Sequence, residues 1–154
     1  KTETLDLSWG RIGIVVGGDS IYPESYRLLA LRDVDVVAVP TRILESWEIE
    51  TGFLERAAEN RMSMVVASKP SEVGTSAIIA PDKDFTLWTE WERPFDGSIN
   101  KPKLTRAPHS ASITRATVDP STASNRLVTL KTDVVSNRPW QLLEPMTRPH
   151  QSNL

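Results

Sequence analysis

The stretch Arg11-Ile12-Gly13-Ile14-Val15-Val16-Gly17-Gly18 decides the fold class of this chain. Alternate residues of a strand face opposite sides of a sheet, and in this stretch both sets are apolar. Because the stretch ends in two glycines, it predicts a buried central strand running into a tight turn. Pro23 suits the first turn of a following helix, and apolar residues three and four apart carry that helix to Arg32. Residues 34–39 form a second β-branched run. The order strand, helix, strand predicts an α/β crossover unit.

The middle of the chain predicts one longer helix and further strands. Apolar residues at helical spacing over residues 44–61 predict the longest helix, with Trp47 on its core face. Residues 62–67 predict a short strand. Residues 76–80 are expected to pair with residues 85–88 in a β-hairpin, because the turn between them is rich in aspartate and begins with proline.

The remainder of the chain is less regular. Residues 92–110 are rich in Pro, Lys, Arg and Ser and predict an irregular surface loop, whereas residues 112–118 predict one more strand. From Ser121 onward, isolated apolar residues are mixed with charges and prolines, which indicates an extended arm rather than a packed helix. We therefore expect an α/β domain over residues 1–120 and an extended C-terminal arm over residues 121–154.

Composition excludes several classes of function. The 154 residues carry a formal net charge of −2 with both signs spread along the chain, so there is no dense basic field to neutralise phosphates. No apolar run approaches the length of a membrane span, and residues 1–7 lack the apolar segment of a signal peptide. The sequence therefore predicts a soluble, cytoplasmic protein without nucleic-acid or membrane partners.

The sequence contains no cysteine and two histidines. The absence of cysteine excludes disulfides, thiolate metal sites and any thiol nucleophile. His109 and His150 lie far apart in polar, proline-flanked stretches, so a metal site built on both would need long-range folding. We expect no metal and no cofactor.

Residues 17–27 follow the buried strand with Gly-Gly-Asp-Ser-Ile-Tyr-Pro-Glu-Ser-Tyr-Arg. This segment resembles the carbon–nitrogen hydrolase family (nitrilase superfamily), in which a buried strand delivers a Cys followed by an aromatic, Asp, two residues, an aromatic, Pro, Glu, two residues and Arg. The matching residues here are Asp19, Tyr22, Pro23, Glu24 and Arg27. Gly17 stands at the position of the family's cysteine.

Four more segments resemble the same family in order along the chain: residues 35–40, 56–60, 76–82 and 132–139. The second is similar to the family's Arg-Ala-x-Glu-Asn helix signature through Glu59 and Asn60. The third resembles its Ser-x-Ile-x-x-Pro-Asp hairpin, with Lys83 where glycine is usual. Agreement of five separate segments in order is unexpected by chance.

The resemblance implies both a fold and a reaction. The fold is an α/β, nitrilase-like α-β-β-α sandwich, of which this chain would form the C-terminal half, with helices on one face of its sheet. The family's active enzymes use a Cys nucleophile, a Glu general base and a Lys that stabilises the tetrahedral intermediate. That Glu and Lys come from chain preceding the cysteine strand, so we expect neither at an equivalent position here. Whether this chain is an enzyme stays open.

The elbow itself allows several interpretations. Together with Asp19, Gly17-Gly18 could form a vestigial active-site elbow, an anion-binding nest of N–H groups, or a plain turn that tolerates positive φ, and the turn is the simplest. A thioester pathway needs a thiolate, and Ser20 is a poor substitute because no histidine lies near it in sequence. For Asp19 and Glu24 we favour turn capping and a helix-dipole role over a catalytic carboxylate pair.

Ordinary packing accounts for most of the remaining signals. Arg27 is expected to pair with a neighbouring carboxylate, and Glu59-Asn60-Arg61 to form a hydrogen-bonded helix end rather than a catalytic cluster. Among the five tryptophans, Trp9 and Trp140 are the candidate interface residues, because an exposed indole lowers solubility unless another surface covers it.

Half of a sandwich would leave an apolar sheet face that must be buried, by a missing N-terminal half-domain, another polypeptide or a second copy in a homo-oligomer. Our first hypothesis is a nitrilase-like domain that is catalytically inactive in this chain and acts as an interaction or structural module. The alternative is part of an amidase-type carbon–nitrogen hydrolase acting on non-peptide C–N bonds, with the remaining machinery on that missing half. A third is small-ligand sensing in a pocket around Gly17.

Overall fold

The computed structural model describes residues 3–81, 101–110, 113–129 and 131–147, and its centre is a six-stranded sheet in the order β1-β2-β3-β4-β5-β6. The strands are β1 (Glu3–Leu7), β2 (Gly10–Ile14), β3 (Val36–Pro40), β4 (Ser63–Ala67), β5 (Ala77–Ala80) and β6 (Lys103–Arg106). Strands β2, β3 and β4 run parallel, and the other neighbours pair antiparallel. The prediction of a mixed α/β fold is confirmed.

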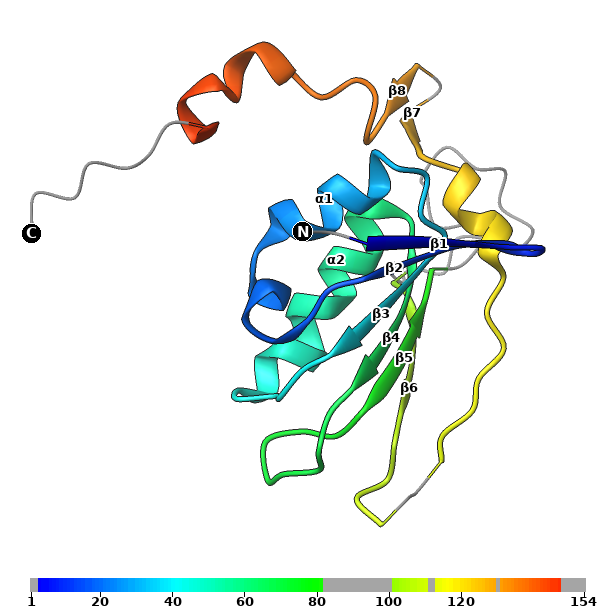
Figure 1. The fold of residues 1–154 in the computed structure, drawn as a ribbon, viewed down its shortest axis with the longest axis vertical. Coiled ribbons are helices and arrows are strands. Elements are labelled where there is room, and N and C mark those ends of the chain that lie inside the picture. The colour runs from blue at the N-terminus through cyan, green and yellow to red at the C-terminus, as the bar shows by residue number, and fades with distance from the viewer. Residues whose placement is uncertain (1–2, 82–100, 111–112, 130, 148–154) are drawn as a thin grey trace, which may run out of the picture.

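Two helical connections lie on the same face of this sheet (Figure 1). The first, from β2 to β3, contains η1 (Gly17–Ile21) and α1 (Pro23–Ala30). The second, from β3 to β4, contains η2 (Glu48–Gly52) and α2 (Phe53–Asn60). The predicted strand, helix, strand order and the placement of helices on one face are therefore confirmed, although α1 ends two residues before Arg32.

The first helix lies very close to the strand that precedes it. A Cβ atom added to Gly13 on β2 would meet the Leu29 side chain at 2.8 Å, so glycine is what allows α1 to approach. Tyr26, Leu29 and Ala30 are completely buried on that face of the helix. The backbone then turns at Asp33, which has a φ of 55°, and enters β3.

The second helical segment differs from its prediction at the start. The Glu48 carboxylate accepts hydrogen bonds from the N–H groups of Leu44 and Glu45 at 2.9 and 2.8 Å. These two residues therefore precede the helix, which does not begin at residue 44. Leu44 and Trp47 are 62% and 55% exposed, and their predicted place on the core face is wrong. Leu44 lies before the helix, and the π-helical turn η2 follows Trp47, so the apolar residues that reach the core from here are Ile49 and Phe53.

Strand β5 pairs with a segment that the sequence did not favour. Its edge away from β4 is taken by β6, with Ile78 opposite Thr105, inside the stretch predicted to be an irregular loop. The predicted partner, residues 85–88, lies outside the described residues. Residues 113–118 form no strand, so that prediction is wrong. Strand β1, which pairs with β2 in a hairpin, was not predicted.

The hydrophobic core lies between the sheet and the helices. Its strand residues are Val37, Val39, Met64, Val66, Ala77 and Ile79, all nearly inaccessible to solvent. Because side chains alternate between the two faces, the intervening residues of the same strands point away from the helices. The core therefore accounts for the apolar residues on one face of the central strands and not for those on the other face.

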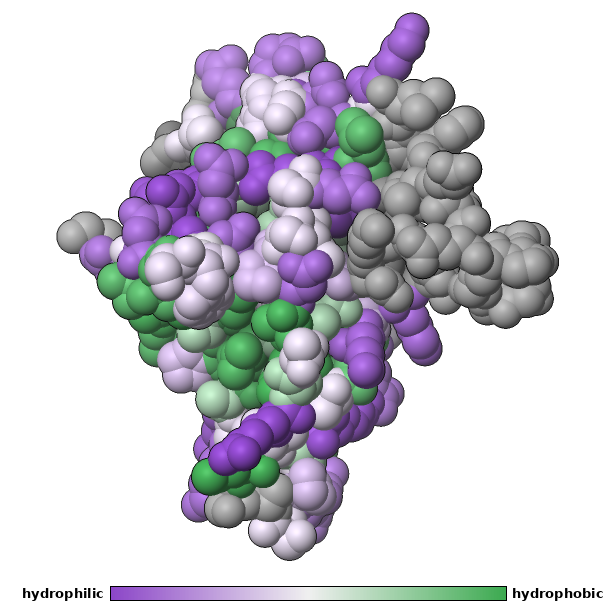
Figure 2. All heavy atoms as spheres, turned by 90° about the vertical axis from the view of Figure 1, so that its right-hand side faces the viewer, coloured by the Kyte–Doolittle hydropathy of each residue, from purple (hydrophilic) through white to green (hydrophobic). Residues whose placement is uncertain are grey.

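The second face of the sheet exposes five large apolar side chains, which we call the uncovered face: Leu5, Leu7, Ile14, Val16 and Val65. They are between 39% and 59% exposed, whereas Val36 and Ser63 at the beginnings of their strands are buried. Figure 2 shows hydrophobic residues gathered on this side of the molecule, opposite the helices. The apolar second face predicted for half of a sandwich is thus present. No α-helix of the described residues lies on it, and residues 113–124 run along this side of the sheet (Figure 1).

The chain after residue 120 contains short elements and no α-helix among its described residues. They are η3 (Pro120–Ser124), β7 (Leu127–Thr129), β8 (Thr132–Asp133), η4 (Trp140–Leu142) and η5 (Glu144–Thr147). Val135 is buried in the core, and Arg126 forms an ion pair with Asp33 at 3.3 Å. The arm is therefore attached to the α/β unit over part of its length. Its separation at residue 120 stays a prediction.

Two absences hold within the ranges that the structure describes. None of those helices is long and apolar enough to cross a membrane. In the same ranges, no three His, Cys, Asp or Glu side chains gather where they could hold a metal ion.

The contact between Gly13 and Leu29 gives a test of the packing. Replacing Gly13 with Ala should lower the free energy of unfolding by about 1–3 kcal/mol, because the buried Leu29 cannot move without displacing α1. Urea denaturation of the variant and the parent measures the difference. Gly18→Ala is the matched control, since in the part of the chain that the structure describes its new methyl group meets no atom within 4 Å beyond its chain neighbours. Equal stability of the two variants would contradict the packing argument.

Candidate functional site

The elbow at the end of β2 is where the sequence places its strongest motif. Beyond Ile14, the chain stays extended through Val15, whose N–H donates to the Ala38 carbonyl at 3.0 Å. At Gly17 the backbone changes to a φ of 55°, and η1 begins. This left-handed conformation is available to glycine without strain, so the elbow has a physical reason for that residue.

Crowding is not the reason for the absence of a side chain at the elbow. Among the described residues, and apart from its two chain neighbours, a Cβ atom added at Gly17 or Gly18 would have no heavy atom within 4 Å. The elbow therefore opens to free space, and residue 17 itself offers no group able to attack a carbonyl or nitrile carbon.

The two carboxylates of the motif do not form a pair. Asp19 and Glu24 are both exposed, Asp19 within η1 and Glu24 in the first turn of α1. The prediction that Asp19 caps the turn into α1 is wrong, because η1 intervenes and the N-cap is Tyr22, with no side-chain hydrogen bond. Glu24 lies where the helix dipole favours a negative charge.

Ser20 points inward rather than into the open space. Its hydroxyl lies 3.2 Å from the Thr41 hydroxyl, which donates to the Gly17 carbonyl at 3.4 Å. Its own carbonyl accepts from the Tyr26 hydroxyl at 2.9 Å. These bonds connect the ends of β2 and β3 with α1. They make Ser20 a structural residue, since it is 5% exposed and, among the described residues, forms no hydrogen bond to a histidine.

Burial raises the pKa of the Tyr26 phenol well above its ordinary value, with a smaller contribution in the same direction from the charge of Glu48. The nearby charge of Arg56 opposes the shift. Tyr26 is thus a neutral donor at physiological pH, which is the form its bond to the Ser20 carbonyl requires.

Three motif residues, Arg27, Glu59 and Asn60, lie together where α1 and α2 meet. The Arg27 guanidinium donates to the Glu59 carbonyl at 3.1 Å and to the Val134 carbonyl at 3.2 Å, and it lies 3.8 Å from the Glu59 carboxylate. Burial, followed by the charge of Arg138, lowers the pKa of Arg27. The predicted pairing of Arg27 with a carboxylate is confirmed, and its partner is Glu59.

The end of α2 is held by its own polar side chains. Glu59 pairs with Arg56 at 2.6 Å, and the Asn60 side chain donates to the Arg56 carbonyl at 2.9 Å. Arg61 closes the helix in the left-handed conformation. The prediction of a hydrogen-bonded helix end is therefore confirmed. The motif residues thus divide between an elbow group and this helix-end group.

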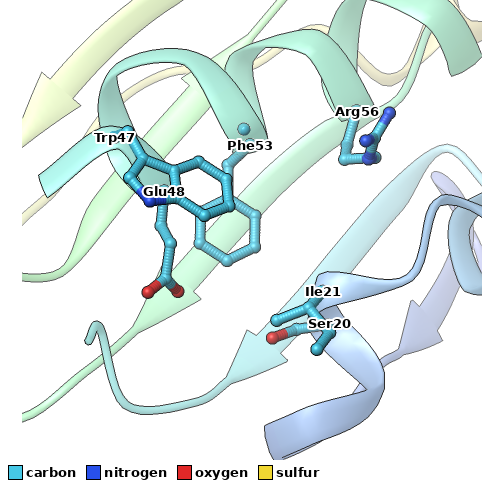
Figure 3. A pocket seen from close by; sticks show the side chains of 7 residues that line it. Ser20, Ile21, Trp47, Glu48, Phe53 and Arg56 are labelled. Carbon is cyan, nitrogen blue, oxygen red and sulfur yellow. The ribbon is translucent and has the colours of Figure 1, made fainter. Parts of the chain in front are cut away.

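A small hollow beside the elbow was not predicted. It is lined by Ser20, Ile21, Trp47, Glu48, Gly52, Phe53 and Arg56, from η1 and from the start of the second helical connection (Figure 3). The Trp47 ring lies over Gly52, where an added Cβ would meet it at 3.3 Å. Sequence periodicity assigned Trp47 to the core, whereas its ring lines this hollow, directly before the π-helical turn η2.

Comparison with known proteins gives a partial match, and no family model matches the chain. A nitrilase from Pyrococcus abyssi (strain GE5 / Orsay) is 32% identical over 85 residues, covering 51% of this chain and 32% of the nitrilase. Two solved structures of an amidase from Nesterenkonia match at 24% identity, with TM-scores of 0.45 and 0.46, over 51% of this chain and 34% and 33% of theirs. The chain is thus similar to the nitrilase superfamily over about half its length, and it spans about a third of these relatives.

The Tyr26 phenol gives a test of the network beneath the elbow. In a Tyr22→Phe variant, which keeps Tyr26 as its only tyrosine, the tyrosinate absorbance should not rise between about pH 9 and 11 while the protein is folded. Because the folded pKa is raised, the stabilisation by Tyr26 is complete below the unfolded pKa of about 10 and declines as pH rises above it. The same variant unfolded in guanidinium should titrate near 10, and a folded protein that does likewise contradicts the burial.

Proposed function

We propose that this chain is a nitrilase-like domain that does not hydrolyse carbon–nitrogen bonds by itself and acts as an interaction or structural module. One observation carries the proposal: the elbow that matches the family's nucleophile position ends in Gly17, which has no side chain. The similarity to a nitrilase supports the choice of family, because it covers about half of this chain.

The chemistry around the elbow supports inactivity. Covalent catalysis needs a nucleophile with a base in hydrogen-bond reach. The sequence has no cysteine, and the hydroxyls of Ser20 and Thr41 beside the elbow lie 3.2 Å from each other in the part-buried network beneath it. The carboxylates of Asp19 and Glu24 are exposed to water and lie in different elements, η1 and α1, so they do not form a buried acid–base pair.

The uncovered face supports the interaction role. Contiguous exposed apolar surface on a folded domain is a mark of contact with another surface. A second copy in a homo-oligomer and a missing N-terminal half-domain are the two partners that suit an apolar sheet face. The exposed indole of Trp9, in the turn between β1 and β2, lies next to this face in the chain.

The open space at Gly17 favours a second candidate, in which the chain is part of an amidase-type carbon–nitrogen hydrolase whose remaining machinery lies on a missing N-terminal half. Coding sequence upstream of Lys1 decides between the two. An upstream segment with a Glu and a Lys in family-like contexts supports this second candidate, and its absence supports the first.

A hydrolysis assay tests the proposal directly. The purified chain should release no ammonia from simple aliphatic amides or nitriles above the rate of a buffer blank, because no residue at the elbow can form an acyl intermediate. Ammonia is measured with a coupled enzymatic assay over several hours. Turnover by the chain that disappears in a Ser20→Ala variant would overturn the inactive assignment.

A restored thiol tests the geometry of the elbow. Gly17→Cys should give a thiol that a chromogenic disulfide reagent modifies rapidly in the folded protein, since no described residue other than its chain neighbours has an atom within 4 Å of the new Cβ. It should still hydrolyse no amide, because the base and the oxyanion-stabilising lysine are lacking.

Gly18→Cys is the matched control, because Gly18 is equally open and does not have a left-handed φ. The Gly17 variant should be less stable than this control by roughly 1–2 kcal/mol, the cost of a left-handed non-glycine residue. Amide turnover by Gly17→Cys would show that the missing groups are within this chain, against the proposal.

A further inference from the structure

The hollow between η1 and η2 has a buried carboxylate in its wall. Glu48 is 7% exposed, and its Oε1 atom accepts hydrogen bonds from the N–H groups of Leu44 and Glu45. Within the described ranges, no basic side chain forms an ion pair with it. A buried charge is costly unless it is paired as well as hydrogen-bonded. The hollow therefore borders a negative charge that a positive ligand would neutralise.

The other charged group of the hollow, Arg56, is already paired. Its guanidinium lies 2.6 Å from the Glu59 carboxylate. Figure 3 shows Arg56 on the far side of Phe53 from the Glu48 carboxylate. An anion in the hollow would have to displace Glu59 from Arg56 and would be repelled by Glu48, whereas a cation would displace no side chain from Glu48. The charges of the lining residues therefore favour a cation.

The size of the hollow selects among cations. Its enclosed part has a volume of about 30 Å³, and the rest is open to solvent. Such a volume holds one water-sized group, which a primary ammonium matches and a guanidinium or trimethylammonium group exceeds. The open part is bordered by Trp47 and Ile21, which are 55% and 57% exposed. These side chains can cover a short carbon chain, and an indole face also attracts cations.

We propose that this hollow binds small primary alkylammonium ions, with the ammonium group beside Glu48 and the carbon chain against Trp47 and Ile21. An ammonium group donates three hydrogen bonds. The Glu48 carboxylate accepts one, and the Ser20 hydroxyl can accept another while it donates to Thr41, 3.2 Å away. The site is separate from the elbow, because Gly17 and Gly18 are not among its lining residues.

A titration with n-butylammonium chloride followed by ¹H–¹⁵N NMR measures the binding at neutral pH, where a primary amine with a pKa of about 10 is protonated. The indole N–H signal of Trp47, identified by its absence in Trp47→Phe, should shift and saturate. The dissociation constant should be about 1 mM, the order expected for so few non-hydrogen atoms. Sodium chloride at the same concentrations is the blank for ionic strength.

A ligand series on the unchanged protein tests charge and size separately. 1-Butanol keeps the carbon chain and lacks the charge, and n-butyltrimethylammonium keeps the charge and has a head too large for the enclosed part. Butyrate reverses the charge. Each should bind at least about tenfold more weakly than n-butylammonium. The series does not depend on any variant being folded.

Two variants test the role of Glu48. Glu48→Gln keeps an oxygen for the N–H groups of Leu44 and Glu45 but removes the charge, so the protein should fold and bind n-butylammonium at least about tenfold more weakly. Glu45→Gln is the matched control, because it removes the same charge from an exposed side chain three positions earlier and should leave binding unchanged. Circular dichroism confirms that both variants are folded.

Three results would overturn the inference. They are an indole signal that does not saturate at about ten times the expected dissociation constant, equal binding of n-butylammonium and n-butyltrimethylammonium, and equal weakening by Glu48→Gln and Glu45→Gln. The site goes beyond the proposed interaction role and does not depend on it. The hydrolysis assay therefore decides the inactive assignment separately.

Discussion

The close approach of Leu29 to Gly13 sets the depth at which α1 lies on the sheet. Because α1 is that close, Tyr26 on the same helix face is completely buried and its hydroxyl reaches the Ser20 carbonyl. Ser20 in turn contacts Thr41, at the end of the next strand. The geometry of the elbow therefore depends on a packing contact at a residue that carries no function of its own.

The order β2, α1, β3 could be predicted because each of its boundaries is local. Pro23 starts the helix, and a run of β-branched residues makes β3, whatever the rest of the chain does. Pairing across the sheet could not be predicted in the same way. The partner of β5 is the short, largely polar β6, more than twenty residues away, whereas the turn signal directly after Ala80 favoured a nearer partner. Strand β1 was missed because its charged residues alternate with leucines over only five positions.

The candidate site likewise has a part that local sequence predicts and a part that depends on contacts between distant segments. The elbow motif and the helix-end group follow from residues close together in sequence, and the structure places them in a strand-to-helix turn and at the end of α2. The hollow between η1 and η2 depends on how two connections cross, and Trp47 lines it directly before a π-helical turn. Periodicity assumes one constant helical repeat, so it cannot locate a residue beside a change of that repeat.

The central strand β3 and the edge strands β1 and β6 differ in residue type. This difference concerns what covers the second face of the sheet. The core strand β3 reads Val-Val-Ala-Val-Pro, with no polar residue at either phase, as in strands buried on both sides. The edge strands β1 and β6 each carry two charged residues, and charges on edge strands are one way in which proteins discourage uncontrolled pairing of exposed edges.

The elbow can keep its shape without a side chain at residue 17, because the network beneath it uses only the backbone oxygen of Gly17. Under the proposed assignment, loss of the nucleophile therefore removes the chemistry and leaves every hydrogen bond of the elbow intact. The same apolar face remains at the centre of the sheet, so the need for a covering surface is independent of catalysis.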